Sequence, residues 1–329
     1  MGKKKCFDDQ WIIITGAAGM IGSCLIRQLN DLGYAKNLIL VDDFKKSIKW
    51  KNLYGKKYSE FMSRHELMQW LKGKESEVEA IIHMGANSST TGTDGCEYYQ
   101  LNYRYTIGLA QYAIENNIRF IYASSAATYG SGLEGFEDDI EQLDVLKPLN
   151  IYGQTKHMFD LWVHRNNLTD SVVGLKYFNV YGPNEYHKGS MASMVYHMYN
   201  QICLTGKVRL FKSNTDQYKD GEQQRDFIYV KDVAKITSEF LFNDVMGIFN
   251  VGNGVARSWN CLAKAVFSAV EKPVNIEYIP MPANMLKTYQ NYTCADMQRI
   301  TSKFTLPKTS LEEGVLDYVN NYLIEEERW

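Results

Sequence analysis

Short apolar runs recur along the chain, and each is bounded by polar or glycine-rich segments. Runs of this kind, separated by amphipathic stretches of helical length, predict buried strands that alternate with helices. The predicted strands are Trp11–Thr15, Leu38–Asp43, Ala80–His83, Phe120–Ala123, Val172–Tyr177 and Gly247–Gly252. Strands and helices that alternate in this way are typical of an α/β fold built on a doubly wound parallel sheet.

The first predicted strand runs directly into a glycine-rich turn that begins a helix. Gly16, Gly19 and Gly22 have the spacing G-x-x-G-x-x-G and follow the strand without a break. A strand, a glycine turn and a helix N-terminus form a frequent pyrophosphate site, because the backbone can approach the ligand closely. We therefore predict a dinucleotide site at this turn, which also includes Met20 and Ile21.

Two carboxylates end the second strand, about twenty residues beyond the glycines. An acid at this position typically binds the ribose hydroxyls of the adenosine, so Asp42 and Asp43 indicate NAD. Lys45, Lys46 and Lys49 follow closely, and they either pair with the 2'-phosphate of NADP or form a solvated charged run. These residues alone leave both cofactors open.

The segment after the third predicted strand contains a glycine–alanine turn, which lets the backbone pass close to a dinucleotide. A helix is predicted next, over Tyr98–Asn116. His83, at the end of the strand, is more consistent with a packed residue than with a ligand. Further cofactor contacts are expected from Met84, Gly85, Ala86, Asn87, Ser88 and Asn102.

The candidate catalytic group combines a strand-end serine with a tyrosine and a lysine on a helix. Ser125 follows the fourth strand, and Tyr152 and Lys156 are four residues apart, so they share one helix face. An ammonium near a phenol favours the phenolate, so we predict that Lys156 lowers the pKa of Tyr152. A nearby serine hydroxyl can orient a substrate alcohol, and the group therefore predicts proton transfer at an alcohol.

The pattern changes after Pro183, where the elements become shorter. A helix over Met194–Leu204, a strand over Val208–Phe211 and a polar loop over Lys212–Gln224 predict a smaller α/β lobe above the sheet. The expected division gives residues 1–178 and 225–256 to a dinucleotide-binding domain, and residues 179–224 and 257–329 mainly to a substrate-binding lobe.

Composition excludes several classes of protein. The formal net charge of the 329 residues is -2, so no basic field points to a nucleic-acid partner. The apolar runs are far too short to span a bilayer, and the basic segment Met1–Lys5 is followed by Asp8 and Asp9, unlike a signal peptide. The six cysteines contain no C-x-x-C pair, so we expect reduced thiols, no metal site and a cytoplasmic location.

The glycine turn, Ser125 and the Tyr152–Lys156 segment together resemble the extended short-chain dehydrogenase/reductases, which include nucleotide-sugar epimerases and dehydratases. A narrower resemblance, to the ADP-L-glycero-D-manno-heptose 6-epimerases, is carried by residues 84–91, 122–130, 148–153, 177–183 and especially His187–Ser193. The related UDP-galactose 4-epimerases lack the His187–Ser193 segment, so that segment is the most specific feature. The resemblance covers nearly the whole chain.

The resemblance implies a Rossmann fold and an isomerase that interconverts ADP-D-glycero-β-D-manno-heptose and ADP-L-glycero-β-D-manno-heptose at C-6. In that family the carbinol is transiently oxidised to a ketone and reduced again with retained NADP. The product supplies the heptose of the lipopolysaccharide inner core. The family also implies a homo-oligomer, typically a homopentamer, whose partner is a small nucleotide sugar rather than a nucleic acid or a membrane.

The resemblance also implies roles for individual residues. Tyr152 and Lys188 are the two acid/base residues, on opposite sides of the reacting carbon. Ser125 orients the hydroxyl, and Lys156 holds the nicotinamide ribose and tunes Tyr152. The ADP-sugar is expected to contact Ser125, Asn179, Lys188, Ser190, His197, Phe211, Arg225 and Tyr289.

Three alternatives stay open at this point. Asp43 stands where the family usually has asparagine, so NAD remains an alternative to NADP. A sister enzyme, either a 4-epimerase, a dehydratase or a reductase, would act on a UDP-, GDP- or dTDP-sugar. A dehydratase normally has an acidic residue soon after the catalytic serine, where this chain has Ala126, Ala127 and Thr128. A non-catalytic dinucleotide sensor commonly loses the tyrosine or the lysine, and this chain keeps both.

Overall fold

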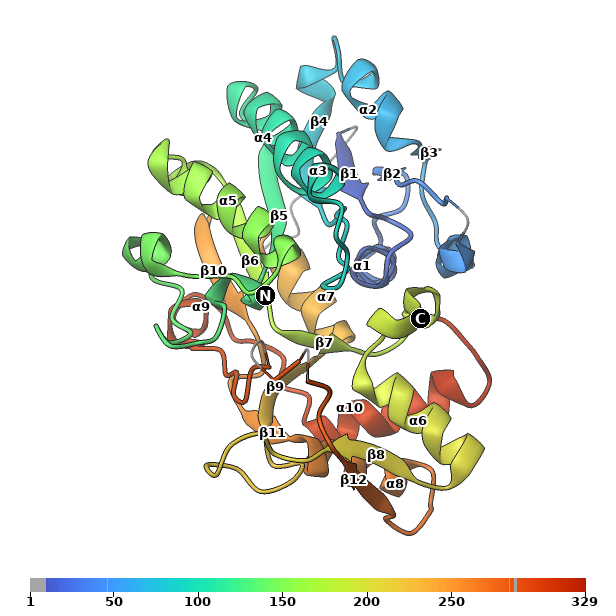
Figure 1. The fold of residues 1–329 in the computed structure, drawn as a ribbon. Helices are drawn as coiled ribbons and strands as arrows, with labels where there is room; N and C mark the ends of the chain where they lie inside the picture. The colour runs from blue at the N-terminus through green and yellow to red at the C-terminus, as the bar shows by residue number, and fades with distance from the viewer. Residues whose placement is uncertain (1–9, 46, 284, 287–288) are drawn as a thin grey trace.

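A parallel seven-stranded sheet forms the centre of the computed structural model, which describes residues 10–45, 47–283, 285–286 and 289–329 (Figure 1). Its strands are β1 (Trp11–Thr15), β2 (Leu38–Val41), β3 (Glu60–Met62), β4 (Val78–His83), β5 (Arg119–Ser125), β6 (Val173–Tyr177) and β10 (Gly247–Val251). Their spatial order is β10-β6-β5-β4-β1-β2-β3. The predicted doubly wound α/β fold is therefore confirmed. The predictions for Met1–Lys5, Cys6 and Lys46 fall outside the described residues.

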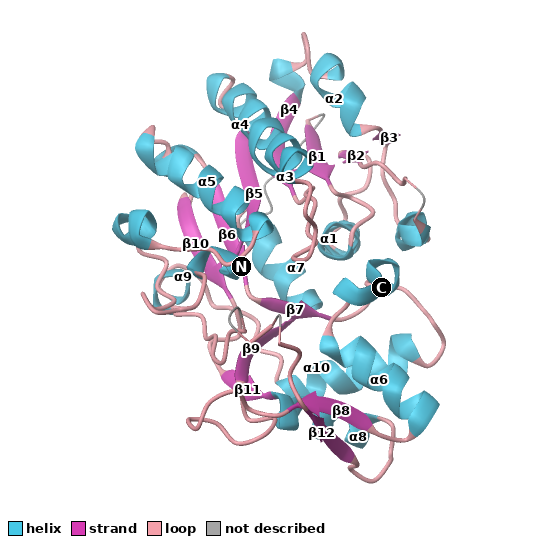
Figure 2. Ribbon diagram, in the orientation of Figure 1, coloured by secondary structure: helices cyan, strands magenta, loops and turns pink. Residues whose placement is uncertain are grey.

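Helices cover both faces of this sheet (Figure 2). One face packs against α1 (Met20–Asp31) and α7 (Val230–Glu239), and the other packs against α2 (Arg64–Trp70), α4 (Tyr105–Glu115) and α5 (Ile151–Arg165). Ile12 and Ile14 belong to the first apolar cluster and Ile13 to the second, because alternate strand residues point to opposite faces. This alternation explains why the strands read as continuous apolar runs.

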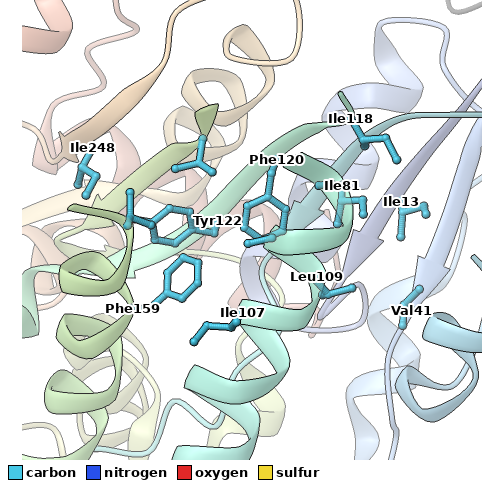
Figure 3. Close-up of a cluster of buried hydrophobic side chains, with 14 of the residues drawn as sticks. Ile13, Val41, Ile81, Ile107, Leu109, Ile118, Phe120, Tyr122, Phe159 and Ile248 are labelled. Carbon is cyan, nitrogen blue, oxygen red and sulfur yellow. The ribbon is translucent and has the colours of Figure 1, made fainter. Parts of the chain in front are cut away.

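The second cluster is mainly aliphatic but includes several buried aromatic side chains, and Figure 3 shows part of it. Phe120 and Tyr122 of β5 pack against Ile107 and Leu109 of α4 and against Phe159 of α5. The rings of Tyr122 and Phe159 meet edge to face with centroids 4.7 Å apart. This packing holds α5, which carries the tyrosine and lysine motif, against the strand that ends in Ser125.

The helix predicted over Tyr98–Asn116 is divided into three parts. A short α3 (Gly95–Tyr98) leads into a π-helical stretch (Tyr99–Arg104), and α4 follows at Tyr105. A π-helical stretch inserts an extra residue into the turn and is frequent at functional sites. Here it contains Asn102, whose side chain is buried.

Two small sheets form the core of the second lobe. One contains β7 (Asn179–Tyr181), β9 (Gln224–Tyr229) and β11 (Ala256–Ser258), and the other pairs β8 (Val208–Phe211) with β12 (Ile276–Ile279). The helices of this part are α6 (Met194–Thr205), α8 (Trp259–Ala269) and α10 (Leu311–Tyr318), whereas the short α9 (Gln298–Thr301) packs beside β10 of the central sheet. Strand β9 pairs only in the small sheet, whereas β10 returns to the central one. The proposed division into two domains stays a prediction.

Sequence patterns found some elements of this lobe and missed others, including the helices α8 and α10. The helix from Met194, the strand Val208–Phe211 and the following loop are confirmed. Strands β7 and β11, like β3 of the central sheet, have only three residues each, too few to show a period, and β12 is only partly buried. No helix in the described ranges has both the length and the apolar character that a membrane crossing requires.

Candidate active site

A cavity of about 860 Å³ lies at the carboxyl edge of the central sheet and is lined from both parts of the chain. Most of the predicted site residues line it: Gly16, Gly19, Met20, Ile21, Gly22, Asp42, Asp43, Lys49, Met84, Gly85, Ala86, Asn87, Ser88, Ser125, Tyr152, Lys156, Asn179 and Lys188. Six predicted residues are not part of this lining: Asn102, Ser190, His197, Phe211, Arg225 and Tyr289.

The glycine turn has no room for side chains at two of its positions. Gly16 has φ +65°, and a Cβ there would lie 2.6 Å from the backbone nitrogen of Gly85. A Cβ at Gly22 would lie 2.2 Å from the carbonyl oxygen of Gly16. Helix α1 begins at Met20 without a side-chain cap, so its first N–H groups remain available to an anion. This cradle fits the pyrophosphate of a dinucleotide.

The two acids after β2 have different partners. Asp42 is buried and accepts hydrogen bonds from the Ala18 N–H at 2.8 Å and from Lys49 Nζ at 2.6 Å. Asp43 accepts a hydrogen bond from Ser63 Oγ at 2.7 Å and forms an ion pair with Arg64 Nε at 2.7 Å. Asp42 therefore braces the glycine turn, while the charge of Asp43 is offset by a cation that also lines the cavity.

His83 joins three parts of the site through neutral hydrogen bonds. Its Nδ1 lies 2.6 Å from Thr15 Oγ1 and its Nε2 lies 3.0 Å from Thr106 Oγ1. Burial, together with the nearby positive charge of Lys156, lowers the pKa of His83 to about 3. The uncharged side chain of His83 therefore links these elements through hydrogen bonds, as expected for a packed residue.

Asn102 lies outside the cavity lining and supports a segment that belongs to it. Its Oδ1 accepts a hydrogen bond from the Asn87 N–H at 2.8 Å, and its Nδ2 donates to the Asn87 carbonyl at 2.9 Å. The same Nδ2 lies 3.2 Å from Thr155 Oγ1. The structure therefore places Asn102 as a support for the segment around Asn87, which itself lines the cavity.

Ser125, Tyr152 and Lys156 come together at the end of β5. Ser125 forms a hydrogen bond with Tyr152, and Lys156 Nζ donates to the Ala123 carbonyl at 2.6 Å. The close approach is permitted by Gly153, where a Cβ would lie 2.7 Å from the Ala127 carbonyl oxygen. Helix α5 therefore packs directly against the end of β5, where Ser125, Tyr152 and Lys156 meet.

The pKa of Tyr152 moves opposite to the predicted direction. Burial raises it, and the hydrogen bond with Ser125 opposes that rise. The prediction that Lys156 lowers this pKa is wrong for the structure, because the ammonium is directed to the Ala123 carbonyl. Burial also lowers the pKa of Lys156 to about 8, and the charge of Asp160 limits that decrease.

A fully buried ion pair lies beneath this group. Asp160 is four residues beyond Lys156 on α5, and its Oδ2 lies 2.9 Å from Lys176 Nζ on β6. The same carboxylate accepts hydrogen bonds from Tyr122 at 2.9 Å and from Ser124 at 2.7 Å. Because every oxygen is paired, this network fixes the register of α5 against the strand that ends in Ser125.

Lys188 approaches the cavity from a loop between β7 and α6. The loop contains a short 3₁₀ helix (Tyr186–Met191) with Gly189 at φ +54°. Glu185 is buried and closes the loop, because it accepts hydrogen bonds from the Ser193 N–H and hydroxyl, each at 2.6 Å. Lys188 Nζ lies 3.7 Å from Met20 Sδ, so the lysine is at the N-terminus of α1.

Three of the predicted substrate contacts form a group beside the cavity. The guanidinium of Arg225 lies 5.4 Å from the Trp259 ring and 5.3 Å from the Tyr289 ring, and Phe211 meets Tyr289 edge to face. Trp259 lines the cavity and donates a hydrogen bond to the Tyr289 hydroxyl at 2.8 Å. Ser190 and His197 lie together elsewhere, with His197 Nε2 3.3 Å from the Ser190 carbonyl.

Arg64 and Trp259 line the cavity but were not predicted from the sequence. Helix α2 begins behind a capping box formed by Ser63 and Glu66, and this local pattern does not indicate that Arg64 faces the acid after β2. Trp259 begins α8 behind the serine cap Ser258. Trp259 is far in sequence from the other cavity residues, so no local pattern indicates that it lines the cavity.

The sequence model of the NAD dependent epimerase/dehydratase family matches residues 12–252, so the chain belongs to this family. Its similarity to ADP-L-glycero-D-manno-heptose-6-epimerase of Fusobacterium nucleatum subsp. nucleatum is 46% identity over 97% of this chain and 99% of that protein. The enzyme of the same name from Nitratidesulfovibrio vulgaris is 45% identical, over 94% and 97%. The crystal structure of Helicobacter pylori ADP-L-glycero-D-manno-heptose-6-epimerase superposes with a TM-score of 0.78 at 29% identity, covering 96% of each chain.

Proposed function

We propose that this protein interconverts ADP-D-glycero-β-D-manno-heptose and ADP-L-glycero-β-D-manno-heptose at C-6. The observation that carries the proposal is that Lys188 lines the same cavity as the hydrogen-bonded pair Tyr152 and Ser125. Two proton-transfer groups from separate parts of the fold suit a carbon whose hydroxyl must be approached from two directions. The full-length similarity to heptose epimerases supports the choice of substrate.

A nicotinamide dinucleotide, when bound, would supply the reversible hydride transfer by which C-6 is oxidised to a ketone and reduced again from its other face. The chain itself moves the hydroxyl proton. Tyr152 accepts it in one direction, with Ser125 orienting the alcohol, and Lys188 accepts it in the other. Arg225 is proposed to bind the sugar-nucleotide phosphates, for which a guanidinium is suited.

The chain offers a matching site for the dinucleotide. The glycine cradle and the N-terminus of α1 are proposed to bind its pyrophosphate, and Lys156 its nicotinamide ribose. We propose NADP as the retained cofactor, with NAD as the alternative. The Asp43–Arg64 ion pair supports NADP, because it offsets the negative charge that would otherwise repel a 2'-phosphate. Lys49, which is paired with Asp42, also lines the cavity.

The resemblance to the heptose epimerases extends the proposal in three respects. We propose a cytoplasmic enzyme that forms a homo-oligomer, with a homopentamer as the expected state. Its product is proposed to supply heptose for the inner core of lipopolysaccharide. The size of the oligomer can be measured by light scattering of the purified protein.

The proposed activity is tested by incubating the purified protein with ADP-D-glycero-β-D-manno-heptose and no added cofactor. Proton NMR resolves the two epimers, and the dinucleotide released from a denatured sample is identified by mass spectrometry. Formation of an epimer mixture together with a recovered nicotinamide dinucleotide is the expected result. A protein that carries the dinucleotide and leaves the heptose unchanged would refute the substrate, and UDP-, GDP- and dTDP-sugars would then be examined.

A further inference from the structure

The loop that carries Lys188 depends on side-chain hydrogen bonds for its position. Its 3₁₀ helix spans only Tyr186–Met191 and includes the positive φ of Gly189. Its last residues are fixed by Glu185, which binds Ser193. Its first residues need a separate anchor, because they pass the glycine turn without forming a sheet with it.

Asn52 is one of two anchors there. The other is the side chain of Asn184, whose Nδ2 donates to Ser23 Oγ at 2.9 Å and to the Trp329 carbonyl at 3.0 Å. Asn52 lies in the 3₁₀ helix Ile48–Leu53, and only 2% of its surface is exposed. Its Nδ2 lies 3.0 Å from the Ala18 carbonyl oxygen in the glycine turn and 2.9 Å from the Asn184 carbonyl oxygen. A primary amide has two N–H donors, so both backbone oxygens can be satisfied by this one side chain.

The residue beside Lys188 is part of the same contact. His187 Nδ1 lies 3.3 Å from Asn52 Nδ2. Burial and the charges of Lys188 and Lys49 lower the pKa of His187 to about 4, so the ring is neutral at physiological pH. Because the two carbonyls already use both N–H groups of Asn52, its approach to His187 is a close contact and not a third full hydrogen bond. Asn52 therefore contacts the chain at Asn184 and His187, directly before Lys188.

We propose that Asn52 is a positioning residue that fixes Lys188 relative to the glycine turn. The dinucleotide-binding turn and the second acid/base residue would then keep one geometry, although they lie in different parts of the fold. This inference rests on the proposed role of Lys188 in epimerisation. Reactions of this type are sensitive to misplacement, since a shift of about 1 Å can cost a hundredfold in rate.

Asn52→Ala removes both donors, and Asn30→Ala is the matched control. Asn30 Nδ2 also bridges two backbone carbonyls, those of Tyr34 and Lys57, each at 2.8 Å, at the other end of α1. We expect Asn52→Ala to lower kcat by roughly tenfold or more, with KM and bound dinucleotide nearly unchanged. Asn30→Ala should retain the wild-type kcat.

A double-mutant cycle separates positioning of Lys188 from a general loss of structure. If Asn52 acts through Lys188, adding Asn52→Ala to Lys188→Met should change kcat by less than about twofold. Added to Tyr152→Phe, it should keep its full effect. A full effect in the Lys188→Met background, or an unchanged kcat in Asn52→Ala alone, would overturn the proposal.

Hydrogen exchange of the dinucleotide-bound protein tests the anchor without any reaction. Peptides that cover residues 184–193 should exchange faster in Asn52→Ala than in the wild type or in Asn30→Ala. Unchanged protection of these peptides would overturn the proposal. A protein that fails to convert the heptose but shows the expected exchange would refute the proposed function while leaving the anchor intact.

Discussion

The two proposed acid/base residues lie in regions that are built differently. Tyr152 is on a fifteen-residue helix that packs against the central sheet above the buried Asp160–Lys176 ion pair. Lys188 is in a loop whose position depends on polar side chains from elsewhere in the chain. The first region is fixed by regular structure and burial, whereas the second is fixed by a few separate hydrogen bonds.

This difference has a consequence for chemistry. Burial around Tyr152 raises its pKa and so holds the phenol protonated until substrate and cofactor change its surroundings. Lys188 has a similar, intermediate exposure and lies near the thioether of Met20. One site therefore offers a phenol held on a rigid helix, and the other offers an amine on a longer, more adjustable side chain.

The largest expected effect comes from removing either proton carrier. Tyr152→Phe and Lys188→Met should each lower turnover by roughly 10² to 10⁴-fold, because general acid–base catalysis contributes about that much. Steady-state conversion of the ADP-heptose gives the rates, and circular dichroism shows that the fold is retained. Full activity in either variant would remove that residue from the mechanism.

The carboxylates that support the regions of Tyr152 and Lys188 should contribute differently to the stability of the protein. Asp160→Asn leaves Lys176 buried and unpaired, so we expect a loss of about 3–5 kcal/mol in the free energy of unfolding, measured in urea. Glu185→Gln keeps one acceptor for Ser193 and should cost only about 1.5–3 kcal/mol.

The control for this comparison is the double variant Asp160→Asn with Lys176→Met, which removes both charges of the buried ion pair. It removes the unpaired charge, so much of the lost stability should return. If Asp160→Asn and Glu185→Gln lowered the free energy of unfolding equally, the buried ion pair would contribute no more to stability than the hydrogen bonds between Glu185 and Ser193.

A smaller effect is expected from pH, through His83 in the first region. Its pKa is about 3 in the folded protein, against an ordinary value of 6.5. Between these values the unfolded chain binds a proton that the folded chain does not, so stability falls as pH falls through this window. From pH 7 to pH 5 the loss is about 2 kcal/mol.

The contribution of this one histidine is isolated by comparing the wild type with His83→Gln. The difference between their free energies of unfolding should shrink by about 2 kcal/mol over the same pH interval. Parallel pH dependences for the two proteins would mean that His83 is not held neutral in the fold.

The smallest expected effect concerns the cofactor end of the cavity. Asp43→Asn removes a carboxylate and leaves Arg64 without its ion-pair partner, so NADP binding should improve relative to NAD. The expected change in the ratio of dissociation constants is roughly fivefold, the equivalent of about 1 kcal/mol. An unchanged ratio, measured by calorimetry, would contradict a 2'-phosphate site beside Asp43 and Arg64.

Local patterns in the sequence were sufficient to predict much of the region that contains Tyr152. The apolar strands, the glycine turn and the shared face of Tyr152 and Lys156 depend on neighbours in sequence, and the structure places all of them at one sheet edge. The pKa direction of Tyr152 could not be predicted, because it depends on burial and on the Ala123 carbonyl, which accepts a hydrogen bond from Lys156.

The second region was much less accessible to prediction from the sequence. Lys188 came only from the resemblance to a known family, and short strands such as β7 and β11 gave no periodic signal. Asn52 was missed because its contacts join segments that are 34 and 132 residues apart along the chain. Residues that act through distant backbone groups have no local sequence signature.

The most direct test of the two-residue mechanism measures its two oxidation steps separately. The wild type, Tyr152→Phe and Lys188→Met, each with its bound dinucleotide, are mixed with one pure epimer at a time, and reduced nicotinamide is followed in a single turnover. The account predicts that each variant loses rapid oxidation of one epimer and keeps it for the other, with opposite preferences. If one variant loses both oxidations and the other loses neither, a single residue serves both directions and the account is contradicted.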